Sequence, residues 1–197
     1  MFILTVKGND PPDRIYFVEL MTQCALAKHA YSRLAEYTRV QLDRDYDVKK
    51  ARPLTPIEVI ADCTVFLSAA AVIAKLLFPR ESSAGARALD LRTKLGVNSL
   101  PHLNSTAVRN SFEHIDERLD RIVRDHKGQE VCQIHVARQQ PQQSVVLKRF
   151  DPNCLSLCFL GDTLDLRACH SELLELERLL KHALKPSRVE DSGEGHG

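Results

Sequence analysis

Arg109, Asn110 and His114 lie close together in the segment 105–127, and their residue types could handle a phosphate group and a proton. An arginine can hold a phosphate through two parallel hydrogen bonds. A histidine can gain or lose a proton near neutral pH. The plainer interpretation is that Arg109 pairs with Glu113, four residues further on, and that His114 is a solvated residue. Both interpretations need these residues on a helix.

The segment 105–127 has the apolar spacing of such a helix, and Gly128 would end it. Asn104 or Ser105 is the expected N-cap. At ~100° per residue the side chains of Arg109 and His114 diverge by about 140°, so one straight helix aims them poorly at one group. The apolar positions recur at alternating steps of four and three: Val108, Phe112, Ile115, Leu119 and Ile122.

This pattern resembles the signature of the HEPN superfamily of helical-bundle proteins. In that signature an Arg is followed by a polar residue, and a His stands a few positions later. Arg109, Asn110 and His114 match it, and the run from Phe112 to Leu119 looks like the same helix in bacterial members. The resemblance covers roughly residues 12–127 and implies a helical bundle.

The resemblance also implies an activity, since many HEPN proteins are metal-independent endoribonucleases. In such a reaction the ribose 2′-OH attacks the adjacent phosphate. By resemblance, Arg109 would stabilise the phosphate, His114 would transfer the proton and Asn110 would orient the substrate. No metal or cofactor is expected. Glu113 is acidic beside the expected phosphate site and would have to turn away or hold Arg109 in place.

Two kinds of HEPN protein remain open. The first is a ribonuclease with an RNA substrate, such as a toxin or antiviral effector. It would be a homodimer, because two motif helices across a two-fold axis can contribute to one cleft. The second is a non-catalytic scaffold or partner subunit that works beside a nucleotidyltransferase or an antitoxin. The intact set of Arg109, Asn110 and His114 favours the enzyme, whereas the modest net charge and Glu113 favour the scaffold.

Composition sets broad limits on the chain. It has 197 residues, a hydrophobic fraction of 44% and a net charge of +1, so a sizeable core is expected and no global attraction to nucleic acid or acidic membranes. The N-terminus, from Met1 to Val6, has no basic region before its short apolar run, so no secretion signal is recognised. We therefore expect a cytoplasmic protein with six reduced cysteines and no membrane contact.

Three further long helices are predicted. The first spans Arg14–Leu42, and a charged loop follows it. Its apolar stripe is expected to run through Ile15, Val18, Met21, Ala25, Leu34 and Ala35. The second spans Pro56–Phe78. Thr55, Pro56 and Glu58 form a capping box at its start, and its apolar composition indicates a central, buried helix. A short helix over Ala86–Leu95 should end at Gly96. The last helix, Leu166–Leu184, has Leu173, Leu176, Leu180 and Ala183 on one stripe.

Between Gly128 and the last helix the sequence pattern is typical of β-strands. Alternation over 131–136, 145–150 and 155–160, with turn residues between, predicts a three-stranded antiparallel meander. The fold class is therefore mainly α: a HEPN-like helical bundle (1–128), a small C-terminal antiparallel β-meander with a final helix packed on the bundle (129–185), and a disordered tail (186–197).

A second group of candidate ligands, Cys154, Cys158, Cys169 and His170, lies in this C-terminal part. On a straight strand Cys154 and Cys158 would share a face but lie about 13 Å apart, whereas zinc sites usually join ligands through a tight turn. Buried thiols are therefore preferred over a zinc-stabilised adaptor. Lys148, Arg149 and Arg138 add a small positive cluster, for which a solvated face is the plain interpretation.

Overall fold

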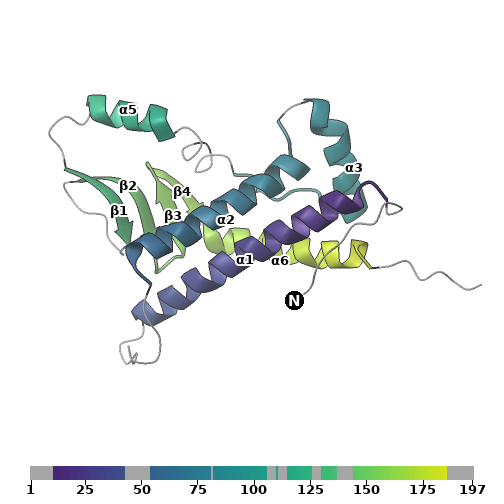
Figure 1. Cartoon of the computed structure of the whole chain (residues 1–197), viewed down its shortest axis with the longest axis horizontal. Coiled ribbons are helices and arrows are strands. Elements are labelled where there is room, and N and C mark those ends of the chain that lie inside the picture. Colours follow the sequence, from purple (N-terminus) through teal and green to yellow (C-terminus); the bar gives the residue numbers. More distant parts are fainter. Residues whose placement is uncertain are drawn as a thin grey trace, which may run out of the picture.

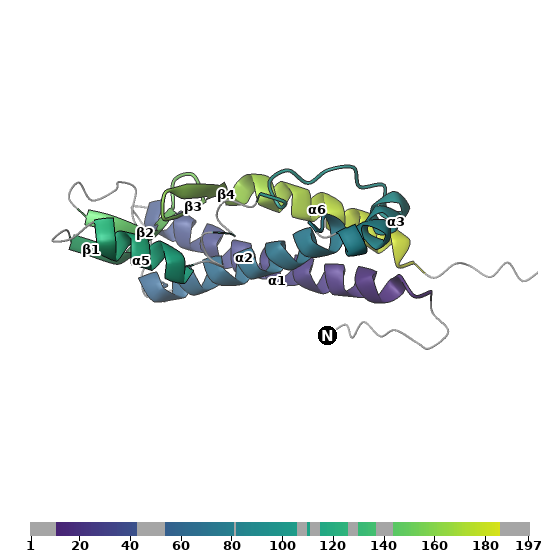
Figure 2. The same cartoon turned by 90° about the horizontal axis from the view of Figure 1, so that it is seen from above.

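The computed structural model describes residues 11–42, 54–80, 82–105, 110, 115–125, 130–136 and 144–185. It is mainly helical, with one small sheet. Figures 1 and 2 show long helices running side by side, the sheet at one end of them and a short helix, α3, at the other. The expected tail at 186–197 lies outside the described residues.

The two longest helices are α1 (Arg14–Leu42) and α2 (Pro56–Leu77), which pack along one another. The predicted capping box at the start of α2 is confirmed. Glu58 Oε2 accepts hydrogen bonds from the Thr55 backbone N–H at 2.7 Å and the Thr55 hydroxyl at 2.8 Å, and the Glu58 N–H donates to Thr55 Oγ1 at 3.4 Å. These bonds satisfy N–H groups that a helix start leaves without partners.

The predicted stripe of α1 was right at Leu34, which is fully buried, and wrong at two of its earlier positions. Ile15 is 57% exposed and Ala25 is also exposed. The apolar side chains that α1 buries are Phe17, Leu20, Cys24, Ala27, Ala30, Leu34 and Tyr37. This face contains small and aromatic residues that a search for branched apolar residues overlooks.

Helix α2 is the one described helix that is long and apolar enough to cross a membrane, and 56% of that stretch is buried inside the protein. Its buried side includes Phe66 and Ile73, both fully enclosed. Its other side leaves Ile57 63% and Val65 42% exposed. The helix therefore contributes to the core from one side, although its sequence is apolar on almost all sides.

A one-turn 3₁₀ helix, η1 (Ser82–Ala84), leads into α3 (Gly85–Leu95), which ends as predicted at Gly96. Gly96 has φ +69° and donates its N–H to the carbonyls of Arg92 and Thr93. A side chain would be strained at this φ, which explains glycine at the helix end.

The sheet has four strands in the order β1-β2-β3-β4: β1 (Glu130–Val136), β2 (Ser144–Asp151), β3 (Ser156–Phe159) and β4 (Asp162–Asp165). The predicted antiparallel three-stranded meander was wrong in two respects. Strand β1 pairs with β2 in parallel, while β2–β3 and β3–β4 are antiparallel. Alternation places side chains on the two faces in the same way for either direction, so it cannot report strand direction.

The unpredicted fourth strand follows a tight hairpin. Leu160 and Gly161 lie between the paired residues Phe159 and Asp162, and both have positive φ, 51° and 93°. Positive φ at both central positions is typical of a type I′ turn, whose twist matches that of paired strands.

Helix α6 (Leu166–Ala183) begins at Asp165, whose carboxylate accepts from the N–H groups of Arg167 at 2.8 Å and Ala168 at 3.0 Å. Its predicted stripe is confirmed at Leu173, Leu176 and Leu180, all fully buried. The helix packs along α1, and a single apolar core takes side chains from α1, α2, α3, the sheet and α6.

Candidate functional site

Of the three predicted site residues, the structure describes Asn110. Asn110 is helical and partly buried. Arg109, Glu113 and His114 lie outside the described residues. The helix α5 (Ile115–Asp125) follows directly and confirms the helical reading of the second half of the segment 105–127.

Helix α5 lies over the sheet, at the end of the molecule away from α3 (Figures 1 and 2). Ile115 packs against the core. Leu119 is 36% exposed and Val123 is 72% exposed. The predicted apolar seam of this helix is thus only partly buried within a single chain.

The charges of α5 are distributed unevenly along its length. Asp116 and Glu117 lie in its first turn and Arg124 in its last. Asp116 and Asp120 are exposed, as expected for solvated charges. Negative charge near the start of a helix and positive charge near its end both favour the helix dipole. The end of the helix nevertheless carries both signs, because Arg124 Nε pairs with Asp125 Oδ1 at 3.1 Å.

The second candidate group is dispersed by the fold. Cys154 precedes β3 instead of lying in it, and it is exposed, with its Sγ 3.0 Å from Ser156 Oγ. The interpretation of Cys154 as a buried thiol was therefore wrong. Cys169 is buried in α6, and burial raises its pKa to about 12. No three His, Cys, Asp or Glu side chains in the described part of the chain are grouped so as to hold a metal ion.

The other buried thiols, Cys24 and Cys63, lie in α1 and α2. Burial raises the pKa of both, that of Cys24 to about 12. A thiolate is the nucleophilic form of cysteine, so these thiols are unreactive at neutral pH. They act as small apolar core residues.

His170 has a role that the sequence did not indicate. Its ring lies against the ring of Tyr31 from α1, with centroids 3.9 Å apart. Burial, with a smaller effect from the nearby Lys28 ammonium, lowers the pKa of His170. A His and a Tyr so far apart in the sequence give no local signal of this contact.

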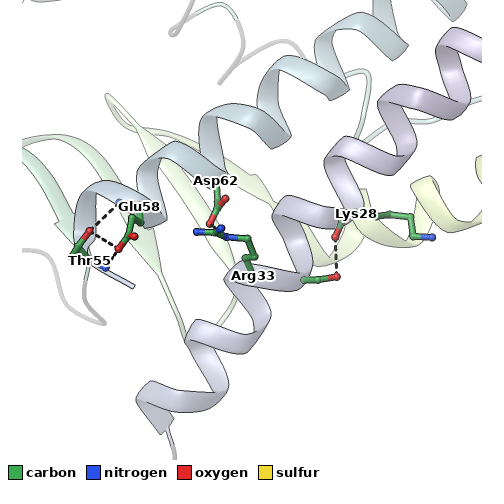
Figure 3. A network of polar contacts seen from close by, with 6 residues as sticks. Lys28, Arg33, Thr55, Glu58 and Asp62 are labelled. Carbon is green, nitrogen blue, oxygen red and sulfur yellow. Dashed lines mark hydrogen bonds and ion pairs between the residues drawn. The ribbon is translucent and has the colours of Figure 1, made fainter. Parts of the chain in front are cut away.

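Polar contacts also join the long helices. Arg33 Nε of α1 lies 2.9 Å from Asp62 Oδ2 of α2, and Asp62 is 9% exposed (Figure 3). Lys28 of α1 pairs with Glu177 of α6, which Lys181 also contacts at 2.7 Å. Burial acts to raise the pKa of Glu177, but the hydrogen bonds from Lys181 and Lys28 hold it below its ordinary value. These pairs fix the helices relative to one another.

The small positive cluster expected near the sheet is partly described. Lys148 and Arg149 lie in β2, both partly buried, and Lys148 Nζ lies 5.8 Å from the centre of the Phe159 ring. Arg138 lies outside the described residues.

Comparisons of the chain with family models, with curated proteins and with solved structures find no match. The resemblance to HEPN proteins therefore rests on the motif residues and the helical setting.

Proposed function

We propose that this chain is a metal-independent endoribonuclease of the HEPN type, cytoplasmic, with Arg109 and His114 as its catalytic residues and Asn110 orienting the substrate. The observation that carries the proposal is the sequence Arg109-Asn110 with His114 four residues beyond Asn110. The helical state of Asn110 and the helix α5 directly after the motif support it. A toxin or an antiviral effector is the kind of protein in which this activity fits.

The proposed reaction is a transfer of the phosphate from one oxygen to another. The 2′-oxygen of one ribose bonds to the phosphorus, and the bond to the 5′-oxygen of the next nucleotide breaks. The proton of the 2′-OH passes to the imidazole of His114, and the leaving oxygen takes up a proton. Arg109 neutralises the charge that builds on the phosphate oxygens. The products are a 2′,3′-cyclic phosphate and a 5′-hydroxyl.

The proposal includes a homodimer in which the two motif helices cross near their starts, across a two-fold axis, so that the two motifs lie close together. The exposed side chains of Leu119 and Val123 would be buried in this contact. Two copies of the motif, at the start of the two helices, would together supply the residues that a single straight helix aims apart.

The test is incubation of purified protein with total RNA in excess EDTA. Cleavage is expected, with 2′,3′-cyclic phosphate ends, and a His114→Ala variant should leave the RNA intact. The variant must retain the wild-type circular dichroism spectrum and melting temperature, so that loss of cleavage reports the site. A requirement for Mg²⁺, or equal cleavage by the variant, would refute the proposal.

The second candidate is a non-catalytic HEPN-like scaffold, a partner subunit of a nucleotidyltransferase or an antitoxin. The exposed apolar side of α5 favours it as well, because Val123 at 72% exposure suits a protein contact. The same RNA experiment separates the two, since a scaffold cuts no RNA.

A further inference from the structure

A cavity of about 610 Å³ lies at the α3 end of the molecule, lined by the end of α2, the outer side of α3 and the segment 97–104. Its size lies in the range of small-molecule sites, roughly 300–1,000 Å³. Figures 1 and 2 place α3 at the opposite end of the long helices from α5. The cavity therefore lies away from α5, and Asn104 at its edge directly precedes the motif segment 105–127.

Among the described residues that line the cavity, Arg92 is the one with a full charge. Its guanidinium lies 4.9 Å from the centre of the Phe78 ring, and Nη1 donates to the Leu77 carbonyl at 3.1 Å. These contacts hold the group in place and leave further N–H donors for a ligand. No ion pair engages Arg92 in the described part of the chain. An arginine that is held in place and makes no ion pair with a described residue is suited to an anion.

The remaining lining combines amides with apolar surface. Asn98 and Asn104 are among the lining residues, and the side-chain amide of each has both donor and acceptor atoms. Leu89 is 58% exposed, and with Phe78 it forms the apolar part of the wall. Amides next to apolar walls can recognise the polar edge of a flat ring while covering its faces.

The segment 97–104 is held in a defined conformation. The carboxylate of Glu172, on α6, accepts from the N–H groups of His102 at 3.0 Å and Leu103 at 2.8 Å. Val97 donates its N–H to the Arg92 carbonyl at 2.9 Å, and Asn104 donates to the Leu100 carbonyl at 2.8 Å. Three side chains anchor the segment in the core: Val97, Leu100 and Leu103. A pre-formed wall lowers the ordering cost of binding.

We propose that this cavity binds a nucleoside monophosphate group, with its phosphate on Arg92 and its base between the apolar wall and the two asparagine amides. This proposal does not rest on the ribonuclease activity. A nucleoside monophosphate combines the features that the lining selects: an anion, a flat apolar body and polar ring edges.

The test is isothermal titration of the purified protein with AMP, GMP, CMP and UMP in turn. At least one should bind with one site per chain. Adenosine or the matching nucleoside, and inorganic phosphate, should each bind at least about ten-fold more weakly, because each lacks one half of the ligand. Binding of none of the four at millimolar concentration would overturn the proposal, as would a nucleoside or phosphate that binds as tightly as the nucleotide.

Two variants and one control locate the binding. Arg92→Gln should weaken it at least about ten-fold. Asn98→Asp places a negative charge at an exposed position of the same wall and should weaken it similarly without disturbing the core. Arg80→Gln removes an exposed positive charge outside the lining and should leave affinity unchanged. Wild-type affinity in both Arg92→Gln and Asn98→Asp would overturn the assignment.

Two further titrations complete the design. The His114→Ala variant should bind the nucleotide with the wild-type affinity. The nucleotide-binding proposal and the ribonuclease proposal can therefore fail independently of each other. Loss of binding in His114→Ala would overturn the separation of the two sites. A short RNA with a 5′-phosphate tests whether the bound nucleotide is free or is the end of an RNA. Tighter binding of this RNA than of the free nucleotide would show that the cavity takes an RNA end, and weaker binding would show that it takes a free nucleotide.

Discussion

The rings of Tyr31 and His170 lie stacked, with their centroids 3.9 Å apart and their planes within 6° of parallel. The contact joins α1 to α6 beside the Lys28–Glu177 ion pair. It removes part of the imidazole from water, and this burial, together with Lys28, lowers the pKa of His170. The neutral imidazole is therefore the form that the folded protein favours.

Stability should consequently fall on mild acidification. The unfolded pKa of histidine is about 6.5. With a lower folded pKa, the folded chain binds fewer protons than the unfolded chain just below that pH. The contribution of His170 is thus complete above about pH 6.5 and is lost as pH falls towards the folded pKa. Urea unfolding of wild type and His170→Phe at pH 7.5 and 5.5 should give a smaller pH effect in the variant. The same change at the exposed His29 should keep the wild-type effect.

Substitutions at Arg109 should separate charge from geometry. Arg109→Ala should abolish RNA cleavage in EDTA, whereas Arg109→Lys should restore only part of it, because lysine cannot make a two-pronged contact with a phosphate. Initial rates on a defined RNA give the comparison. Equal rates for the lysine variant and wild type would show that a point charge suffices, and equal rates for the alanine variant would remove Arg109 from the site.

The proposed dimer predicts a change of mass. Light scattering at micromolar concentration should give twice the 22.2 kDa of one chain for wild type. A Leu119→Glu and Val123→Glu double variant should give a single chain with an unchanged melting temperature, because both side chains are exposed in one chain. Ile15→Glu, at a position 57% exposed on α1, is the matched control and should remain dimeric. A monomeric wild type with full RNA cleavage would exclude the composite site.

Removal of the Glu172 carboxylate should loosen the segment 97–104. Glu172→Ala leaves the N–H groups of His102 and Leu103 without their acceptors. We expect the free energy of unfolding to fall by about 1–2 kcal/mol. This is a small value for hydrogen bonds to a charged group, because the exposed His102 can form a hydrogen bond with water instead. Hydrogen exchange at the Leu103 amide should accelerate. Glu175→Ala removes an exposed carboxylate that pairs with Arg178 on the same helix, and little change is expected there.

The cysteines should differ sharply in reactivity. A thiol reagent at pH 7.5 should label Cys154 first, since it is exposed, and should label Cys24, Cys63 and Cys169 only after unfolding. Mass spectrometry of peptides over time gives the order. A Cys154→Ser variant should lose the fastest phase, and rapid labelling of any of the three buried cysteines would contradict their placement in the core.

The helix boundaries were available from the sequence because they depend on neighbouring residues. A cap, a proline and a glutamate define the start of α2 at Pro56 through bonds within a single turn. Gly96 ends α3 for an equally local reason, its positive φ. The leucine stripe of α6 was likewise predictable, because one apolar residue per turn leaves a helix a single side to bury.

Tertiary structure decided what depends on distant partners. The parallel pairing of β1 with β2, the buried side of α1 and the exposure of Cys154 all follow from which element packs against which. The stacking of Tyr31 on His170 and the binding of the segment 97–104 by Glu172 join residues far apart in the chain. Periodicity describes one element at a time. The direction of a strand, the side of a helix that is buried and the residues that meet across a core are set by packing between elements.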